Sequence, residues 1–323
     1  MSEDQHHDDS HYFWRKNGAR YYSLGVYYKR LFGAPVRKVS VDAHFSCPNI
    51  DGTVGRGGCV FCNATSFSPS RRFGLEELNA QIDDGVKRLR YRFGESKYIA
   101  YFQPSTNTHA PVETLRRVYE AAIQREDIVG VAIGTRPDAL PEEVLTLLQE
   151  ISARTYLSLE LGLQSTHDKS LQWMNRGCDY ATFLDAVARC HAHGLRVGAH
   201  LILGLPTETR EDLLVTAERV AALGLESVKL HNLYVVKGTR LAQMWRDNEF
   251  TLPTLQEYAQ MVVDFLERLD PQTVVERVCG EATEDYLLAP AWCAQKHAGL
   301  NAVAEAFARR RSYQGRLFQK KSE

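Results

Sequence analysis

The chain has 323 residues, of which 44% are hydrophobic and 24% are charged, and its net charge is −1. This composition is typical of a soluble globular protein that can bury a sizeable core, and a net charge so close to zero does not by itself indicate a polyanionic partner. There is no apolar run near the ~20 residues that cross a bilayer, the acidic N-terminus does not resemble a signal peptide, and the seven cysteines form no compact secreted framework. We therefore expect a cytoplasmic protein that does not enter a membrane.

The first part of the chain combines basic and aromatic residues. Residues 1–17 are expected to be a disordered N-terminus. No acidic residue occurs between Ser10 and Val41, whereas Arg, Lys, Tyr, Phe and Trp alternate there, and a second basic run lies at 309–321. RNA-binding surfaces combine aromatic rings that stack on bases with cations that neutralise phosphates. Two interpretations stay open: an RNA-binding surface, or aromatics that cap the fold beneath solvated charges.

A strand predicted over 36–43 leads into a glycine-rich loop that carries three cysteines, Cys47, Cys59 and Cys62. The Cys-x-x-Cys turn can direct two thiolates to one metal or cluster, and the glycines let the backbone pack close to a bound group. Three thiols are one fewer than a closed zinc site or a simple iron–sulfur electron carrier uses. On a cubane cluster they leave one iron open to substrate or cofactor. The alternative is a closed Cys3His zinc site with His44, in a non-catalytic RNA-binding protein.

Strands and helices alternate after this loop. Six strands followed by helices predict a parallel sheet with right-handed crossovers, two units short of a complete barrel. Beyond residue 240 we expect only helices, with no strand partners. The predicted strands are 36–43, 97–102, 128–133, 155–161, 195–203 and 227–233, and the helices are 74–93, 111–124, 141–151, 180–193, 210–223, 254–269 and 290–310.

Ligands of parallel α/β folds bind at the carboxyl ends of the strands, so polar residues there are candidates for a site. Glu160 lies inside a strand that should be buried, where a carboxylate is costly without partners. His200 on the fifth strand is either a ligand or a satisfied core residue. Arg136 could hold a carboxylate or phosphate, or could only accompany a turn at Asp138.

The end of the sixth strand and the isolated cysteines leave further alternatives open. Lys229 and His231 share one face of their strand and could face a substrate or simply be solvated. Cys279 and Cys293 belong to no close ligand motif. They are either small core residues or the ligands of a second cluster.

The cysteine loop, with Cys-Pro-Asn-Ile-Asp-Gly at 47–52, resembles that of the radical S-adenosylmethionine (radical SAM) enzymes. Gly-Thr-Arg-Pro-Asp at 134–138 and Glu-Leu-Gly-Leu-Gln-Ser at 160–165 look like the YhcC/YtqA type, in the branch of the elongator catalytic subunit. The resemblance implies a partial (β/α)6 TIM-like barrel over 18–240. It also implies an N-terminal extension and a helical C-terminal extension over 241–323 that packs on the core.

The resemblance also implies ligands and roles. The three cysteines would hold a 4Fe-4S cluster whose open iron is chelated by S-adenosyl-L-methionine (SAM). An electron from a flavodoxin or ferredoxin would cleave SAM to methionine and a 5′-deoxyadenosyl radical. The residues expected near SAM are Phe61 and Gly204 at the adenine, Gln103 and Ser105 at the methionine amino group, Gln164 and His200 at the ribose, Arg176 at the carboxylate, and Glu160.

The same resemblance, together with the basic aromatic ends, predicts a tRNA substrate and perhaps a wobble uridine. The other enzymatic possibility is a small-molecule or peptide substrate, as in the porphyrinogen branch.

Overall fold

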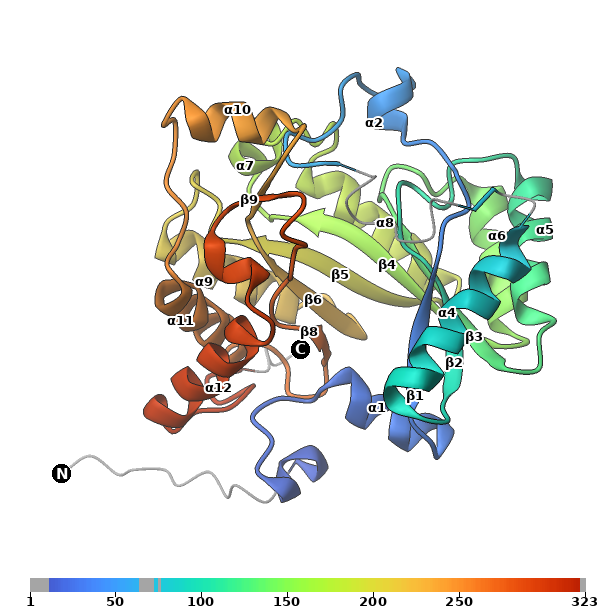
Figure 1. Ribbon diagram of the computed structural model, residues 1–323, viewed down its shortest axis with the longest axis horizontal. Helices are drawn as coiled ribbons and strands as arrows, with labels where there is room; N and C mark the ends of the chain where they lie inside the picture. Colours follow the sequence, from blue (N-terminus) through green and yellow to red (C-terminus); the bar gives the residue numbers. More distant parts are fainter. Residues whose placement is uncertain (1–11, 64–72, 75–76, 320–323) are drawn as a thin grey trace.

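The computed structural model describes residues 12–63, 73–74 and 77–319. Seven parallel strands form one curled, open sheet in the order β1-β2-β3-β4-β5-β6-β8, which confirms the predicted partial barrel (Figure 1). The strands are β1 (Val36–Val41), β2 (Lys97–Phe102), β3 (Ile128–Thr135), β4 (Tyr156–Gln164), β5 (Arg196–Leu203), β6 (Ser227–Asn232) and β8 (Val274–Arg277).

The seventh strand corrects the prediction that no strand follows residue 240. β8 pairs in parallel with β6, from Ser227 opposite Val274 to Lys229 opposite Arg277. It is only four residues long and has just two apolar residues, so it shows too little alternation to be recognised in the sequence. The C-terminal region therefore extends the barrel wall, in addition to adding helices to it.

Helices cover the outer face of the sheet. They are α4 (Leu78–Phe93), α5 (Val112–Ile123), α6 (Glu142–Ser152), α8 (Tyr180–Ala192), α9 (Arg210–Ala221), α11 (Leu255–Leu266) and α12 (Ala298–Arg310). Alternation along the strands sorts the side chains: Leu157, Leu159 and Leu161 of β4 join the outer apolar core. Ser158 and Glu160 point the other way, so the inner face of the barrel is polar.

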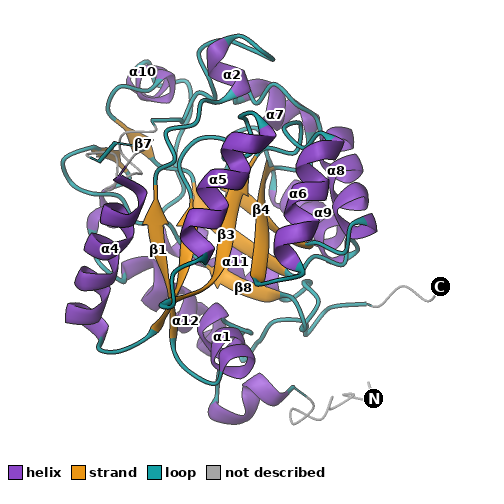
Figure 2. Cartoon of the chain, turned by 90° about the vertical axis from the view of Figure 1, so that its right-hand side faces the viewer, coloured by secondary structure: helices purple, strands orange, loops and turns teal. Residues whose placement is uncertain are grey.

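The N-terminal segment closes one end of the barrel. η1 (Phe13–Asn17) and α1 (Leu24–Phe32) lie below the sheet, at the end opposite α2 (Pro48–Asp51) (Figure 2). Tyr28 is 2% exposed in a cluster with Ile99 and Ala132, and Trp14 is 4% exposed. The expectation of disorder is therefore wrong for residues 13–17, while residues 1–11 lie outside the described part of the chain. The capping interpretation is correct for these two aromatic residues, which cannot stack on bases.

The C-terminal region continues through β7 (Val235–Val236), α10 (Arg240–Arg246), β9 (Leu287–Ala289) and η4 (Ala291–Ala294). Its last residues return to the N-terminal segment, because the Gln314 backbone N–H donates to the Arg20 carbonyl at 2.8 Å. The two basic ends of the chain are thus neighbours. Within the described ranges, every helix is too short or too polar to cross a bilayer.

Candidate functional site

The three cysteines lie on one loop at the carboxyl end of β1. Cys47 is the N-cap of α2, which begins with Pro48 at its first position. Cys59 is buried and Cys62 is exposed, and the Cys62 N–H donates to the Cys59 carbonyl at 3.0 Å to form a tight turn. A Cβ at Gly55 would come within 2.3 Å of Asn49 Oδ1, so this glycine lets the loop wrap closely around Asn49.

Two buried side chains fasten the loop to the barrel. Asn49 Nδ2 donates to the Asn175 carbonyl at 2.7 Å and approaches Cys59 Sγ at 3.8 Å. Arg176 Nη2 donates to the Gly162 carbonyl at 2.6 Å, and its Nη1 lies 3.8 Å from the same sulfur. Cys59 therefore sits between an amide and a guanidinium.

The donor set fits an iron–sulfur cluster better than a closed zinc site. Among the described residues no three His, Cys, Asp or Glu side chains converge on one ion position, and His44 Nε2 is directed at the Phe73 carbonyl at 2.6 Å. A cubane takes each cysteine on a different iron, so its thiols need not converge on one point. Arg176 Nε is buried and has no hydrogen-bond partner in the described structure, which leaves a donor beside Cys59 for a bound group.

A charged network fills the interior of the barrel around Glu160, which is fully buried. Its Oε1 accepts from Lys38 Nζ at 2.5 Å. Its Oε2 accepts from Tyr101 at 2.8 Å and Lys229 at 3.1 Å, and lies 2.5 Å from His200 Nε2. Because both oxygens are engaged by protein groups, Glu160 holds its neighbours in place instead of presenting a free carboxylate.

The network perturbs the titration of its members. Burial opposes ionisation of Glu160, but Lys229 and Lys38 outweigh it and keep the pKa of this carboxyl well below its usual value. Burial lowers the pKa of Lys229 to about 8, although Glu160 opposes the change. Burial and the Lys229 charge also lower the pKa of His200, so its ring is neutral near pH 7. A neutral imidazole hydrogen-bonded to Glu160 has its tautomer fixed.

The remaining predicted residues lie at the carboxyl ends of the strands. Gln164 and Ser105 adopt left-handed backbone conformations, with φ of 72° and 64°. Gln103 is half-buried at the end of β2. Gly204 has φ of 82°, and a Cβ there would come within 2.7 Å of Pro253, so no other residue fits. Phe61 packs against an apolar cluster that includes Val60, Leu171 and Met174.

Other predicted residues turn out to have structural partners. Arg136 forms a bidentate ion pair with Asp138 at 2.7 and 2.8 Å, and its Nη1 donates to the Arg176 carbonyl at 2.9 Å. Cys279 and Cys293 both contact the amide of buried Asn232, at 3.3 and 2.9 Å. Arg136 therefore fixes the loop that bears Arg176. The two cysteines are part of the packing behind β6.

Several residues of this site were missed in the sequence. Lys38, Tyr101 and Glu276 complete the interior network, where Glu276 accepts from Lys38 at 2.5 Å and from Ser227 at 2.8 Å. Lys38 lies between Val36 and Val39 in a predicted strand. A charged residue within such a strand could have indicated a side chain that faces the barrel interior. Glu276 gave no such signal, because its strand was not recognised.

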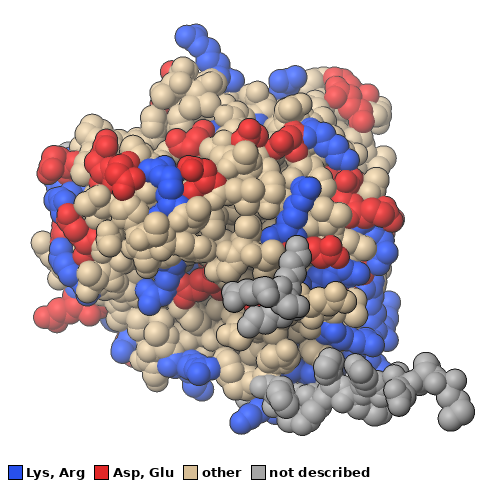
Figure 3. Space-filling model, turned by 180° about the vertical axis from the view of Figure 1, so that it is seen from behind, with Lys and Arg blue, Asp and Glu red and all other residues tan. Residues whose placement is uncertain are grey.

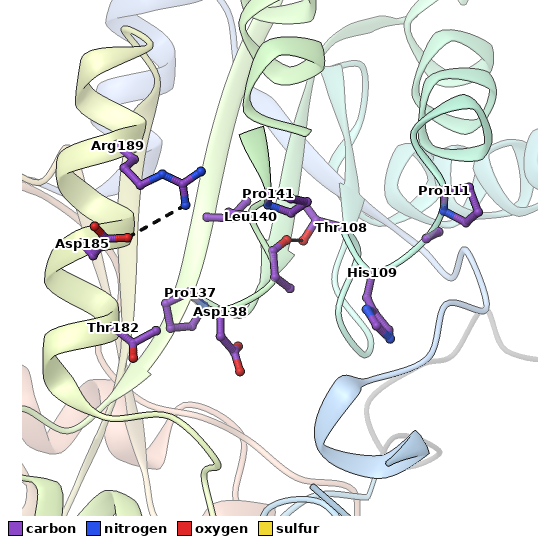
Figure 4. Close-up of a pocket in the computed structure, with 12 residues that line it drawn as sticks. Thr108, His109, Pro111, Pro137, Asp138, Leu140, Pro141, Thr182, Asp185 and Arg189 are labelled. Atoms are coloured by element: carbon purple, nitrogen blue, oxygen red, sulfur yellow. Dashed lines mark hydrogen bonds and ion pairs between the residues drawn. The ribbon is translucent and has the colours of Figure 1, made fainter. Parts of the chain in front are cut away.

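A separate groove of about 670 Å³ opens outside the loops that follow β2 and β3 (Figure 4). Thr182 and Asp185 of α8 form one wall, and His109 lies at the other end, where it pairs with Asp51 at 2.9 Å. None of the residues predicted to contact SAM lines this groove. Its walls carry both charge signs, which gives no preference for one class of ligand.

Comparisons with known proteins agree with this geometry. The model of the Radical SAM superfamily matches residues 51–220, and that of the Radical SAM C-terminal domain matches residues 225–309. The chain is 38% identical over 304 residues to protein YtqA of Bacillus subtilis (strain 168), covering 94% of both chains. It is 39% identical over 274 residues to protein YhcC of Escherichia coli (strain K12), covering 84% of this chain and 87% of YhcC.

Two more distant matches involve archaeal proteins. A tRNA uridine(34) acetyltransferase of Methanocaldococcus infernus is 28% identical over 166 residues, which are 50% of this chain and 30% of that protein. A solved structure of Elp3 from Methanocaldococcus infernus superposes with a TM-score of 0.62 at 18% identity, covering 86% of this chain and 64% of Elp3. At that identity the match shows a shared fold.

Proposed function

Since the chain belongs to the radical SAM superfamily, and within it to the family of YtqA and YhcC, we propose that it is a radical SAM enzyme that modifies RNA. The observation that carries the proposal is the placement of three thiols on one loop at the carboxyl end of β1, above a barrel whose interior is charged and ordered. That edge of a parallel sheet is where α/β folds bind their ligands.

In this proposal Cys47, Cys59 and Cys62 hold a 4Fe-4S cluster. When bound together, the cluster and SAM supply reductive cleavage of the sulfonium bond and a 5′-deoxyadenosyl radical that abstracts hydrogen. Arg176 lies beside Cys59, and its unpaired Nε is available to the SAM carboxylate. Asn49 holds the cysteine loop against Asn175, and Arg136 holds the backbone of Arg176 in place.

The residues predicted near SAM keep their proposed roles with one refinement. Gln103, Ser105 and Gln164 offer polar groups at the strand ends, and Phe61 and Gly204 border the adenine. Glu160 acts through His200: it fixes the tautomer and orientation of that ring, which then faces the ribose. Glu160 is thus a positioning residue. The reductant is a flavodoxin or ferredoxin.

Two observations support RNA as the substrate. One is the match to a tRNA-modifying enzyme over half of the chain. The other is the meeting of the basic ends, where Arg15 lies over the ring of Tyr313 at 3.5 Å. Several exposed cations of the two basic segments have no carboxylate partner within the described ranges. They are Lys16, Lys29, Arg30, Arg311 and Arg316. Lys and Arg side chains also gather along one edge in Figure 3, as a phosphate-binding surface would require.

The cluster assignment is tested with anaerobically reconstituted protein, by measuring iron content and the formation of 5′-deoxyadenosine from SAM. Cys59→Ala should lose both, because the loop then offers only two thiolates. Cys190→Ala is the matched control, since Cys190 is buried in α8 and belongs to the outer core. Equal activity in the two variants would refute the assignment.

The RNA assignment is tested by mass spectrometry of bulk RNA nucleosides from a strain without the protein, compared with its parent. A nucleoside that disappears, and returns with the wild-type chain but not with Cys59→Ala, is the expected result. Unchanged nucleosides together with an altered metabolite or peptide would identify the other substrate class.

A further inference from the structure

A second group of polar side chains lies in the barrel interior beside the Glu160 network. His231 comes from β6 and Arg277 from β8, and Arg277 Nη2 lies 2.8 Å from His231 Nε2. The His231 ring is 5.7 Å from that of His200, centroid to centroid. This group lies at the β8 edge of the sheet, whereas the cysteine loop follows β1 at the opposite edge.

Arg277 is a cation with no carboxylate partner among the described residues. Lys38 pairs with Glu160 and Glu276, and Lys229 pairs with Glu160. Within the described structure, the hydrogen bonds of Arg277 run only to the neutral acceptor His231, and its Nε is buried without any partner. A guanidinium that has a buried Nε and no counter-charge is costly, and its planar donors match an oxyanion.

The loop that follows β8 packs closely against this pair. Gly280 follows β8, and a Cβ there would approach Tyr234 at 3.3 Å and His231 Nδ1 at 3.5 Å. A side chain larger than glycine would therefore crowd Tyr234 and the imidazole. His231 and Arg277 are each partly exposed, so solvent reaches the group near the carboxyl ends of β6 and β8.

We propose that Arg277 and His231 form an oxyanion-binding site that holds a phosphate or carboxylate group of the substrate within the barrel. Its role as a substrate site rests on the proposed function, but the oxyanion site itself does not. The guanidinium supplies the charge and a fork of donors, and the imidazole supplies a second donor once it is protonated.

The electrostatics of His231 couple proton uptake to anion binding. Burial, Arg277, His200 and Lys229 all lower the pKa of His231, and only Glu160 opposes them. An anion on Arg277 would cancel part of this repulsion and raise the pKa. Anion affinity should therefore increase as the pH falls below the ordinary histidine value of 6.5, because the bound state takes up a proton that the free state does not.

The test measures binding of inorganic phosphate and of acetate to the reconstituted protein without SAM, by calorimetry, with chloride added to hold ionic strength constant. Wild-type protein should bind at least one of the two anions, and the preferred anion distinguishes a phosphate from a carboxylate group. Arg277→Gln should weaken binding by about tenfold or more, because a charge-assisted hydrogen bond is lost. Arg309→Gln is the matched control, since Arg309 is exposed on α12 and pairs with Glu305.

Two further substitutions at this pair also test anion binding. If Arg277→Gln fails to fold, Arg277→Lys should bind with intermediate affinity, and His231→Gln should bind but lose the dependence on pH. Equal anion affinity in wild type and Arg277→Gln, or no binding by wild type, would overturn the site. Formation of 5′-deoxyadenosine is scored separately: a wild-type chain that binds phosphate but never cleaves SAM refutes the radical function and leaves the anion site intact.

Discussion

Among single residues, Glu160 has the greatest influence on the barrel interior. It is the acceptor for two lysines and a tyrosine and the partner of a histidine, with no exposure to solvent. A buried carboxylate of this kind is stable only because its partners offset the loss of hydration. The role of Glu160 near SAM remains a prediction. Its contacts indicate that it acts by positioning His200.

Glu160→Gln should destabilise the fold by roughly 3–5 kcal/mol, because it leaves buried Lys229 without its carboxylate partner and Lys38 with Glu276 alone. Urea unfolding of the cluster-free protein measures this. Glu305→Gln, which removes only an exposed helical ion pair, should change stability by less than about 1 kcal/mol. A comparably small loss of unfolding free energy in both variants would contradict a stabilising role for the Glu160 network.

Two partly buried histidines, His200 and His231, predict how stability depends on pH. Burial lowers the pKa of both His200 and His231 below the ordinary value of 6.5. Below that pH the unfolded chain binds more protons at these two histidines than the folded chain does. The free energy of unfolding should therefore fall as the pH drops from about 7 to about 5. Thermal unfolding across this range measures the slope. His200→Gln combined with His231→Gln should flatten it, whereas exposed His191→Gln should not.

Among the elements, α4 packs closely against β1 because Gly85 has no side chain at the contact. A Cβ at Gly85 would come within 2.5 Å of Val39 Cγ1, so this close approach depends on the absence of a side chain. A helix interior ordinarily favours alanine over glycine by about 1 kcal/mol. Here packing against the strand that leads to the cysteine loop outweighs helix propensity.

Gly85→Ala should therefore destabilise the protein by about 1–3 kcal/mol through overpacking, in spite of its better helix propensity. Gly25→Ala in α1 is the matched control, because a Cβ there meets nothing within 4 Å and should be neutral or stabilising. Midpoints of urea unfolding compare the two. A stabilising Gly85→Ala would show that α4 can move away from β1 without cost.

The N-terminal element η1 gives a second prediction at this scale. Trp14 is 4% exposed and its Nε1 donates to the Pro271 carbonyl at 3.0 Å, whereas neighbouring Phe13 is 41% exposed. Trp14→Ala should cost about 3–5 kcal/mol, because a buried aromatic and a hydrogen bond are lost. Phe13→Ala should cost far less. Equal effects in chemical unfolding would mean that η1 does not cap the barrel.

For the whole molecule, the joined basic ends lie close to the closed end of the barrel, and the cysteine loop lies at the open end. Arg311 and Arg316 are exposed there without a carboxylate partner in the described part of the chain. If RNA is the substrate, cations at the closed end would bind its backbone at a distance from the reacting nucleoside. Such contacts contribute affinity that falls with added salt.

Replacing Arg311 and Arg316 together by glutamate should weaken tRNA binding and reduce the salt slope by about one per lost phosphate contact. Fluorescence titrations at several salt concentrations measure both. Arg116 and Arg154, which pair with Glu150 and Glu120 on the outer helices, give a control of equal charge change. An unaltered slope in the first variant would exclude this surface from RNA binding.

The sequence alone was sufficient to predict the superfamily and the partial barrel, and both predictions are confirmed. The reason is that these features are local: a cysteine spacing, glycines that permit a sharp loop, and apolar runs that alternate with amphipathic helices. The cysteine and SAM assignments came from the same local motifs and remain predictions.

Tertiary structure alone decided the rest. It brought Lys38, Glu160, Lys229 and Glu276 together from four strands, added the short strand β8, and buried Trp14 beneath the barrel. Contacts between residues that are far apart in the chain, such as Lys38 and Glu160 at 122 positions, leave no periodic signal in a single sequence. Whether a lysine is solvated or is half of a buried ion pair depends on what the curled sheet places opposite it.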